Sequence, residues 1–214
     1  MFKNSCLQSN FWNRFALFFL FFAVISLNIS GGNERKGRTK QKYIEKKFPT
    51  PNIDHGAVNS VEGVILHHTA EPTIEKSLGI LTSTKKKVGT HVVIDTDGTR
   101  YIMASPETVT YHAGWSYLNG KSGCNYFTIG IEFQGNTLEK PLTEDQIKSA
   151  IEYLIPLMTK YKINVSSVVT HEMVRNAYKK MHPKKRCSGK VDITQTEYKR
   201  FMKALKAELN KKKK

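Results

Sequence analysis

The chain has 214 residues, enough for one domain with a full hydrophobic core and too few for two large domains. Its net charge of +16 lies mostly near the ends, since residues 31–47 carry +5 and residues 199–214 carry +7, whereas residues 48–198 carry only +2. A nucleic-acid-binding domain carries its positive charge on the fold itself, so this distribution argues against nucleic acid as a partner. We expect the basic tails either to contact anionic surfaces of the cell envelope or simply to be solvated.

The first 30 residues predict export. Residues 15–25 form an unbroken run of 11 apolar residues that follows Lys3 and Arg14. This length matches the core of a signal peptide, whereas about 20 residues are needed to span a bilayer. We expect a signal peptide at residues 1–30 that is cleaved near Gly31; an uncleaved membrane anchor is the alternative. The protein is therefore expected in the periplasm, in the cell envelope or secreted.

The next segment, residues 31–52, is polar and charged and contains proline, which predicts a basic linker. We expect the folded domain at residues 53–210 and a basic tail at residues 211–214.

Within the domain, short runs rich in β-branched and aromatic residues alternate with longer helical patterns. The short runs predict strands at residues 61–68, 91–95, 100–103, 127–134 and 166–170, and Asp97-Gly98 predicts a hairpin turn between the second and third. Helices are predicted at residues 143–162 and 194–209, each opened by a capping box, and Pro156 is expected to kink or interrupt the first of them. Strands interleaved with helices predict a single α/β domain with a central mixed β-sheet flanked by helices.

Candidate metal ligands stand at the ends of two predicted strands. His67 and His68 close the first strand, His171 follows the strand at residues 166–170, and Cys187 lies in a loop. Imidazole nitrogens and a thiolate suit Zn²⁺, and three protein ligands leave a fourth position for water. Because adjacent strand residues point to opposite faces, only one of His67 and His68 can face a given site. The chain lacks a CxxC or HExxH motif at these positions, so the spacing alone is only suggestive.

Six segments resemble, in order, the successive motifs of the type 2 N-acetylmuramoyl-L-alanine amidases, a family that includes phage lysozyme-type amidases and peptidoglycan recognition proteins. The segments are VILHHTA (64–70), GTHVVIDTDGTRY (89–101), YHAGWS (111–116), NYFTIGIEFQG (125–135), VVTHE (168–172) and KRC (185–187). The resemblance covers about residues 60–205. It implies the peptidoglycan recognition protein fold and a zinc hydrolase acting on peptidoglycan. The bond cut would be the amide between the lactyl group of N-acetylmuramic acid and L-alanine.

The resemblance also implies a metal site. It assigns one Zn²⁺ per chain to His67, His171 and Cys187, although members of the family differ in whether the third ligand is Cys or Asp. Lys185, two residues before Cys187, falls where the family places a catalytic lysine.

The remaining site residues follow from the same motifs. Glu132 falls where one branch of the family places a catalytic glutamate. Another branch uses a tyrosine at the position that Thr90 occupies here, so Glu132 is expected to carry the proton. Residues expected to contact the substrate are His112, Thr69, Trp115 and Asn125.

Several alternatives stay open at this point. His182 lies in the long interval between His171 and Cys187 and is an alternative third ligand. Cys124 and Cys187 are the cysteines left after signal removal, and in an exported protein they could form a disulfide that consumes the ligand. A peptidoglycan-binding module without catalysis and a zinc peptidase cutting within the stem peptide are the alternative functions. We expect the protein to be a monomer.

Overall fold

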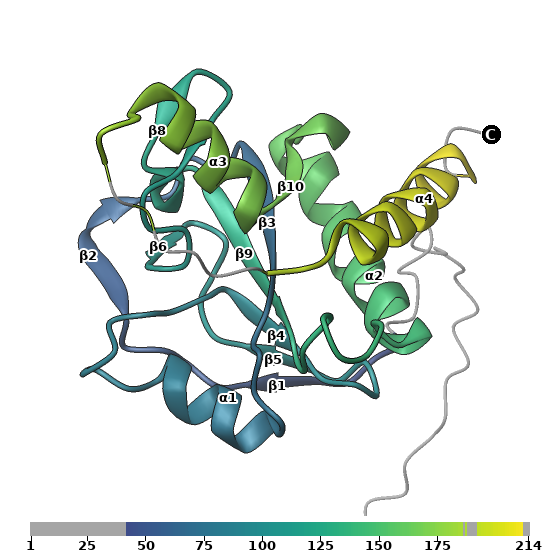
Figure 1. Ribbon diagram of the computed structural model, residues 1–214. Coiled ribbons are helices and arrows are strands. Elements are labelled where there is room, and N and C mark those ends of the chain that lie inside the picture. Colours follow the sequence, from purple (N-terminus) through teal and green to yellow (C-terminus); the bar gives the residue numbers. More distant parts are fainter. Residues whose placement is uncertain (1–41, 186, 188–191, 212–214) are drawn as a thin grey trace, which may run out of the picture. The chain divides into compact units, whose positions relative to one another are not determined.

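The computed structural model describes residues 42–185, 187 and 192–211 (Figure 1). The predicted signal peptide or anchor, most of the predicted linker and the last three residues of the predicted tail lie outside these ranges. Among the helices that are described, none is both long and apolar enough to cross a membrane.

A six-stranded sheet forms the centre of the domain, in the order β1-β5-β4-β9-β3-β10. Antiparallel pairing occurs between β4 and β5, and the other neighbours pair in parallel. The predicted mixed sheet is confirmed. Its strands are β1 (Glu45–Lys47), β3 (Gly63–His68), β4 (Val92–Ile94), β5 (Arg100–Ile102), β9 (Thr128–Phe133) and β10 (Val168–Thr170).

Smaller elements surround this sheet. Two short two-stranded sheets pair β2 (Ile53–Val58) with β6 (Thr108–Thr110), and β7 (Tyr117–Leu118) with β8 (Lys121–Ser122). Two 3₁₀ turns, η1 (Cys124–Tyr126) and η2 (Val165–Ser167), precede β9 and β10. The helices are α1 (Ile74–Leu81), α2 (Glu144–Tyr161), α3 (His171–Met181) and α4 (Gln195–Lys211).

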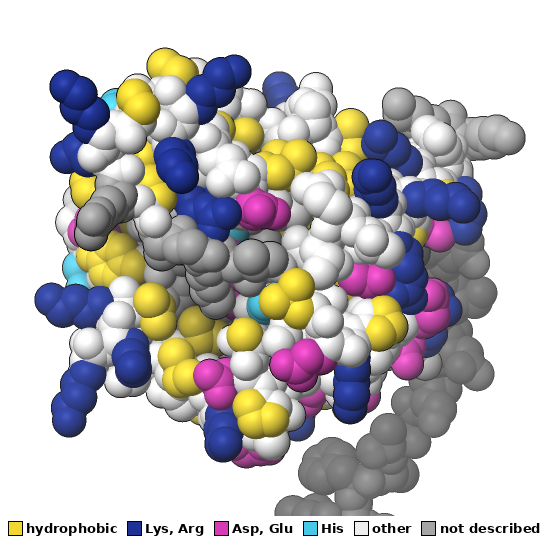
Figure 2. Space-filling model, viewed as in Figure 1, with side chains coloured by type: hydrophobic (Ala, Val, Ile, Leu, Met, Phe, Trp, Pro, Cys, Tyr) yellow, Lys and Arg dark blue, Asp and Glu magenta, His cyan; other side chains and the backbone are white. Residues whose placement is uncertain are grey.

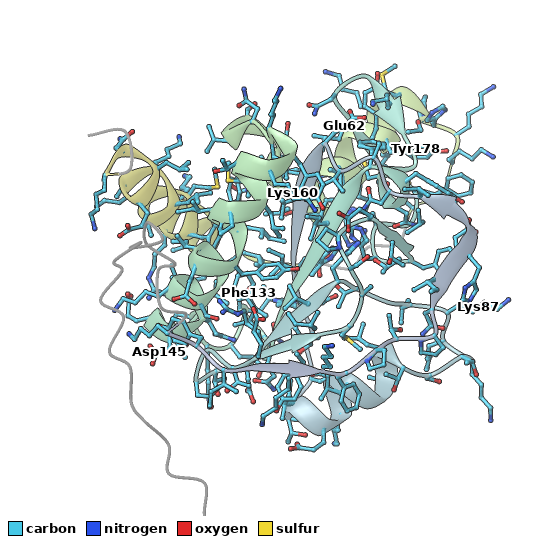
Figure 3. All side chains as sticks on the ribbon, turned by 180° about the vertical axis from the view of Figure 1, so that it is seen from behind. Glu62, Lys87, Phe133, Asp145, Lys160 and Tyr178 are labelled. Carbon is cyan, nitrogen blue, oxygen red and sulfur yellow. The ribbon has the colours of Figure 1, made fainter. Side chains whose placement is uncertain are left out.

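The main core lies between one face of the sheet and the helix pair α2 and α4 (Figure 1). Alternate residues of the central strands reach this core, as the two-residue period of a strand requires. Phe133, which is labelled in Figure 3, packs edge-on against Phe201 of α4. The predicted capping box opens α2, because Thr143 accepts a hydrogen bond from the backbone of Gln146 and the Gln146 side chain accepts one from Thr143. The helix continues through Pro156 without a break.

The opposite face of the sheet is covered only in part. Leu78 and Leu81 of α1 pack there against Val93, while Val174 of α3 packs against Ile65. Neither of these two small apolar clusters covers the middle of the face. Polar side chains of β3 and β9 lie at this middle position.

The domain begins earlier than the sequence predicts. Part of the expected linker forms β1, which pairs in parallel with β5 at the edge of the sheet. The chain is then anchored at Asn52, whose buried side-chain amide donates to the carbonyls of Leu81, Ser83 and Val88. The side chains of β1 are exposed and two of the three are basic. For this reason the sequence of the segment predicts a solvated linker, although its backbone forms an edge strand.

Candidate functional site

Three side chains with metal-binding atoms meet on the partly covered face of the sheet. His67 is the next-to-last residue of β3, His171 is the first residue of α3, and Asp192 lies ahead of α4. One candidate ligand atom from each lies within 4.8 Å of the others. The side-chain oxygen Oδ2 of Asp192 is 2.5 Å from His171 Nδ1 and 3.8 Å from His67 Nδ1.

Each histidine of this group uses its other ring nitrogen elsewhere. The Nε2–H of His171 donates to the carbonyl of Ala113 at 3.1 Å, because a carbonyl can only accept. The Nε2 of His67 lies 3.2 Å from His112 Nδ1. Both histidines therefore turn Nδ1 toward Asp192.

The neighbours of His112 determine which ring donates in the hydrogen bond between His67 and His112. The hydroxyl of Thr128 donates to the carbonyl of Cys124 at 2.7 Å, so its oxygen accepts from His112 Nε2–H at 3.4 Å. His112 Nδ1 then carries the lone pair and accepts from His67 Nε2–H. A histidine that binds a metal through one nitrogen typically donates its other N–H in this way, and both members of the group satisfy that requirement.

The charge of the group also suits a cation. Asp192 is fully buried, and burial alone would raise its pKa. The hydrogen bonds from His171 and His67 outweigh this effect and hold the pKa of Asp192 well below its usual range. With a metal ion bound at Nδ1 of both rings in place of a proton, two imidazoles and an ionised carboxylate form a donor set that fits Zn²⁺ and leaves a fourth position for water.

The third member of the group differs from the expected Cys187. Cys187 lies outside the group, and so does the alternative His182, whose ring packs against Tyr178 at a centroid distance of 4.3 Å. Cys124 and Cys187 are both free, so no disulfide joins them. Asp192 takes the place expected for Cys187 because α3 carries the chain away from His171, and Asp192 lies where the chain returns to begin α4.

The sequence contains a signal for Asp192. The family that the chain resembles accepts Asp as its third ligand, and Lys190 stands two residues before Asp192, the same spacing that separates Lys185 from Cys187.

A cleft with a volume of about 840 Å³ opens at this group. Six of the expected site residues line it, namely His67, Thr69, His112, Asn125, Glu132 and His171. The described residues that line the cleft do not include Lys185, Trp115 or Cys187. The other walls come from α1 and from the segments around Asn52 and Lys87.

Glu132 is held beside the histidines by the sheet. It pairs in register with His67 across the parallel strands β9 and β3, so both side chains point to the same face. Its exposed fraction is 8%, and it lines the cleft. A carboxylate in this position can reach a water molecule or substrate atom next to the metal-binding group.

His112 lies against the backbone of β9, and its neighbours require it to be neutral. Burial, reinforced by the imidazoles of His67, His91 and His171, lowers the pKa of His112 well below its usual value. Gly130 allows the close approach, because a Cβ there would lie 2.7 Å from His112 Cγ. Behind it, burial lowers the pKa of His91 to about 4, and its Nδ1 accepts from the backbone N–H of Gly130.

Asn125 and Thr69, expected to contact the substrate, also bind the protein's own backbone. The Asn125 side-chain oxygen accepts from the backbone N–H groups of His112 at 3.1 Å and Ala113 at 2.7 Å. Asn125 thereby fixes the segment that contacts both His67 and His171. The hydroxyl of Thr69 accepts from the backbone N–H of Gly135 at 3.1 Å.

Trp115 and Lys185 lie together on the surface. The indole is 59% exposed and stacks on Tyr178 of α3, which is labelled in Figure 3. The Nζ of Lys185 lies 5.6 Å from the centre of the Trp115 ring. Over the face shown in Figure 2, lysine and arginine side chains are spread out and not gathered in one stripe.

Comparison with known proteins gives matches along most of the domain. The family model described as N-acetylmuramoyl-L-alanine amidase matches residues 57–190, more than half of the chain. The 1,6-anhydro-N-acetylmuramyl-L-alanine amidase AmpD of Haemophilus influenzae is 35% identical over 88 residues, which are 40% of this chain and 46% of that protein. The match thus spans about half the length of this curated relative.

Solved structures show the same fold. A crystal structure of a selenomethionine derivative of AmpD superposes with a TM-score of 0.57 at 19% identity, covering 73% of this chain and 93% of that one. The N-acetylmuramoyl-L-alanine amidase LysC from Clostridium intestinale URNW gives a TM-score of 0.52 at 25% identity, covering 79% of this chain and 97% of that one.

Proposed function

Because the chain belongs to the N-acetylmuramoyl-L-alanine amidase family, we propose that it is a zinc hydrolase of peptidoglycan. The bond cleaved is the amide between the lactyl group of N-acetylmuramic acid and the L-alanine of the stem peptide. The observation that carries this proposal is the group of His67, His171 and Asp192, whose two histidines line a cleft that Glu132 also lines.

In this proposal His67, His171 and Asp192 hold one Zn²⁺ per chain. A zinc ion in such a site lowers the pKa of a water molecule toward about 7 and polarises the carbonyl to be attacked. The hydrogen bonds that His112 and the carbonyl of Ala113 accept from the Nε2–H groups would leave Nδ1 of both histidines to bind the metal in place of a proton.

Glu132 carries the proton. It removes a proton from the attacking water and returns it to the leaving amine of L-alanine, so that one carboxylate serves both halves of the hydrolysis. Its location beside His67 in the sheet register supports this role. His112 is neutral and already engaged with His67, so we assign it to positioning that ligand in place of the expected contact with substrate.

A lysine that stabilises the oxyanion is part of the family pattern, two residues before the third ligand. With Asp192 as that ligand, the pattern assigns the role to Lys190 in place of Lys185. The contact of Lys185 with Trp115 supports this change. Loss of one such cation typically lowers the rate by roughly 10²–10³. Comparing Lys190→Ala with Lys185→Ala tests the assignment, and only the first is expected to lose activity.

The remaining walls of the cleft would receive the stem peptide, and the exposed Trp115, which follows Gly114 of the cleft wall in the chain, would contact the glycan. The presence of three ligand side chains together with Glu132 favours an enzyme over a binding module without catalysis. Export directed by residues 1–30 would bring the enzyme to its substrate, and the basic tails would add contact with anionic polymers of the envelope.

Metal removal tests this proposal. Dialysis of the purified full-length protein against a chelator should abolish release of peptides from purified peptidoglycan, and one equivalent of Zn²⁺ should restore it. Full activity in protein shown by elemental analysis to contain no metal would contradict the proposal. Glu132→Gln is the matched control, because it should keep the metal while losing the activity.

A further inference from the structure

Thr137, in the loop that follows β9, connects the end of β3 to the segment that carries Asp192. Its backbone N–H donates to His68 Nδ1 at 3.0 Å, and its hydroxyl oxygen lies 2.9 Å from the same nitrogen. The backbone N–H of Thr194 donates to the Thr137 hydroxyl oxygen at 3.1 Å. Thr137 thus contacts His68, the residue after His67, and Thr194, two residues after Asp192.

The directions of these hydrogen bonds are fixed by chemistry. A backbone N–H can only donate, so His68 Nδ1 is an acceptor and the proton of this ring lies on Nε2. The Thr137 oxygen accepts from Thr194, and its own hydroxyl proton shares the lone pair of His68 Nδ1 with the Thr137 backbone N–H. The bonds therefore run in one direction, from Thr194 through Thr137 to His68.

This connection lies on the opposite side of the sheet from the cleft. His68 follows His67 in β3 and points to the other face, where the core helices α2 and α4 pack. Thr137 is not among the residues that line the cleft. The connection therefore reaches the metal-binding group from the face of the sheet opposite the cleft. It makes no contact with the place where substrate would bind.

The two residues that follow Asp192 are held by contacts of their own. Ile193 is fully buried in the main core, and Thr194 caps α4, accepting at its hydroxyl from the N–H of Glu197. The main core that contains Ile193 also contains Val64 and Leu66, so apolar packing joins this segment to β3, the strand that carries His67. The hydrogen bonds of Thr137 add a polar link from Thr194 to His68 at the end of the same strand.

We propose that Thr137 is a positioning residue of the metal centre, which holds Asp192 in register with His67 through His68 and Thr194. The inference rests on the proposed role of His67, His171 and Asp192 as ligands. Loss of a group that orients a ligand typically weakens metal affinity 10–100-fold, and we expect Thr137→Val to do so.

The test compares three variants of the full-length protein. Thr137→Val keeps the shape and removes the hydroxyl, Thr137→Ser keeps the hydroxyl, and Thr159→Val removes a hydroxyl that bonds the carbonyl of Ile155 within its own helix. Competition with a chromophoric chelator gives the Zn²⁺ dissociation constant of each. We expect a 10–100-fold increase for Thr137→Val only, with KM on peptidoglycan unchanged at saturating zinc.

Two further measurements keep the outcome interpretable. Thermal unfolding of the metal-free proteins shows whether Thr137→Val still folds, and Thr137→Ala offers a smaller side chain if it does not. Wild-type affinity in Thr137→Val, or an equal loss in Thr137→Ser or Thr159→Val, overturns the inference. If the wild-type protein binds no Zn²⁺, the proposed function fails instead, so the two failures are distinguishable.

Discussion

Gly130→Ala should damage the site without touching a ligand. Gly130 lies in β9 beneath the ring of His112, and a Cβ at this position would lie 2.7 Å from His112 Cγ, 2.8 Å from its Nδ1 and 2.8 Å from Thr90 Oγ1. Ordinary contact begins at 3.4 Å, so the ring must move by roughly 0.7 Å in a closely packed interior. The ring cannot move freely, because its Nδ1 bonds His67 and its Nε2 bonds Thr128.

Overpacking of this kind typically costs about 1–3 kcal/mol of unfolding free energy. We expect a loss in this range for the metal-free protein in urea unfolding, and a Zn²⁺ affinity at least about 10-fold weaker because His67 loses its orienting partner. Gly79→Ala is the control, since nothing lies within 4 Å of its added Cβ in α1, and it should stabilise the protein by up to about 1 kcal/mol. An unchanged urea midpoint and zinc affinity in Gly130→Ala would refute the reasoning about His112.

Three further predictions concern the ligands, the proton carrier and pH. Asp192→Ala should lose stoichiometric zinc in elemental analysis while Cys187→Ser retains it, and the reverse result would restore the thiolate as third ligand. Glu132→Gln should retain zinc and bind peptidoglycan, with kcat lower by roughly 10²–10⁴; turnover within a few-fold of wild type would remove Glu132 from the mechanism. His91 has a folded-state pKa of about 4, below its usual 6.5, so the stability it contributes is present above pH 6.5 and is lost as the pH falls toward 4. Urea unfolding of metal-free protein should show a decrease of about 2 kcal/mol from this group between pH 7 and pH 5, and a His91 ring resonance that titrates near 6.5 would contradict it.

Much of the sheet could be predicted from the sequence, because its central strands are buried on both faces and rich in β-branched residues. The strands that carry His67 and Glu132 were predictable for this reason, as was the capping box of α2. The edge strand β1 was not, because its side chains are charged and exposed and only its backbone bonds reveal it.

Two helices were also missed. The helix α3 begins directly after β10, and Thr170 ends the strand while capping the helix, so the sequence offers no linker between them. The helix α1 has only eight residues, too few for its pattern to stand out.

At the site, the strand-end histidines could be predicted and the third member of their group could not. The opposite directions of His67 and His68 follow from strand geometry alone. Asp192 is 21 residues from His171 in sequence, and only the return of the chain after α3 brings the two within 2.5 Å. The roles of His112 and Asn125 depend on hydrogen-bond direction, which no spacing in the sequence encodes.

The bond that is cut can be identified by mass spectrometry of intact peptidoglycan digested with the zinc-loaded protein. Hydrolysis at the lactyl amide predicts stem peptides that begin with a free L-alanine amine, together with glycan whose N-acetylmuramic acid retains a free lactyl carboxylate. Peptides shortened within the stem, with L-alanine still attached to the sugar, would contradict an amidase and identify a peptidase instead.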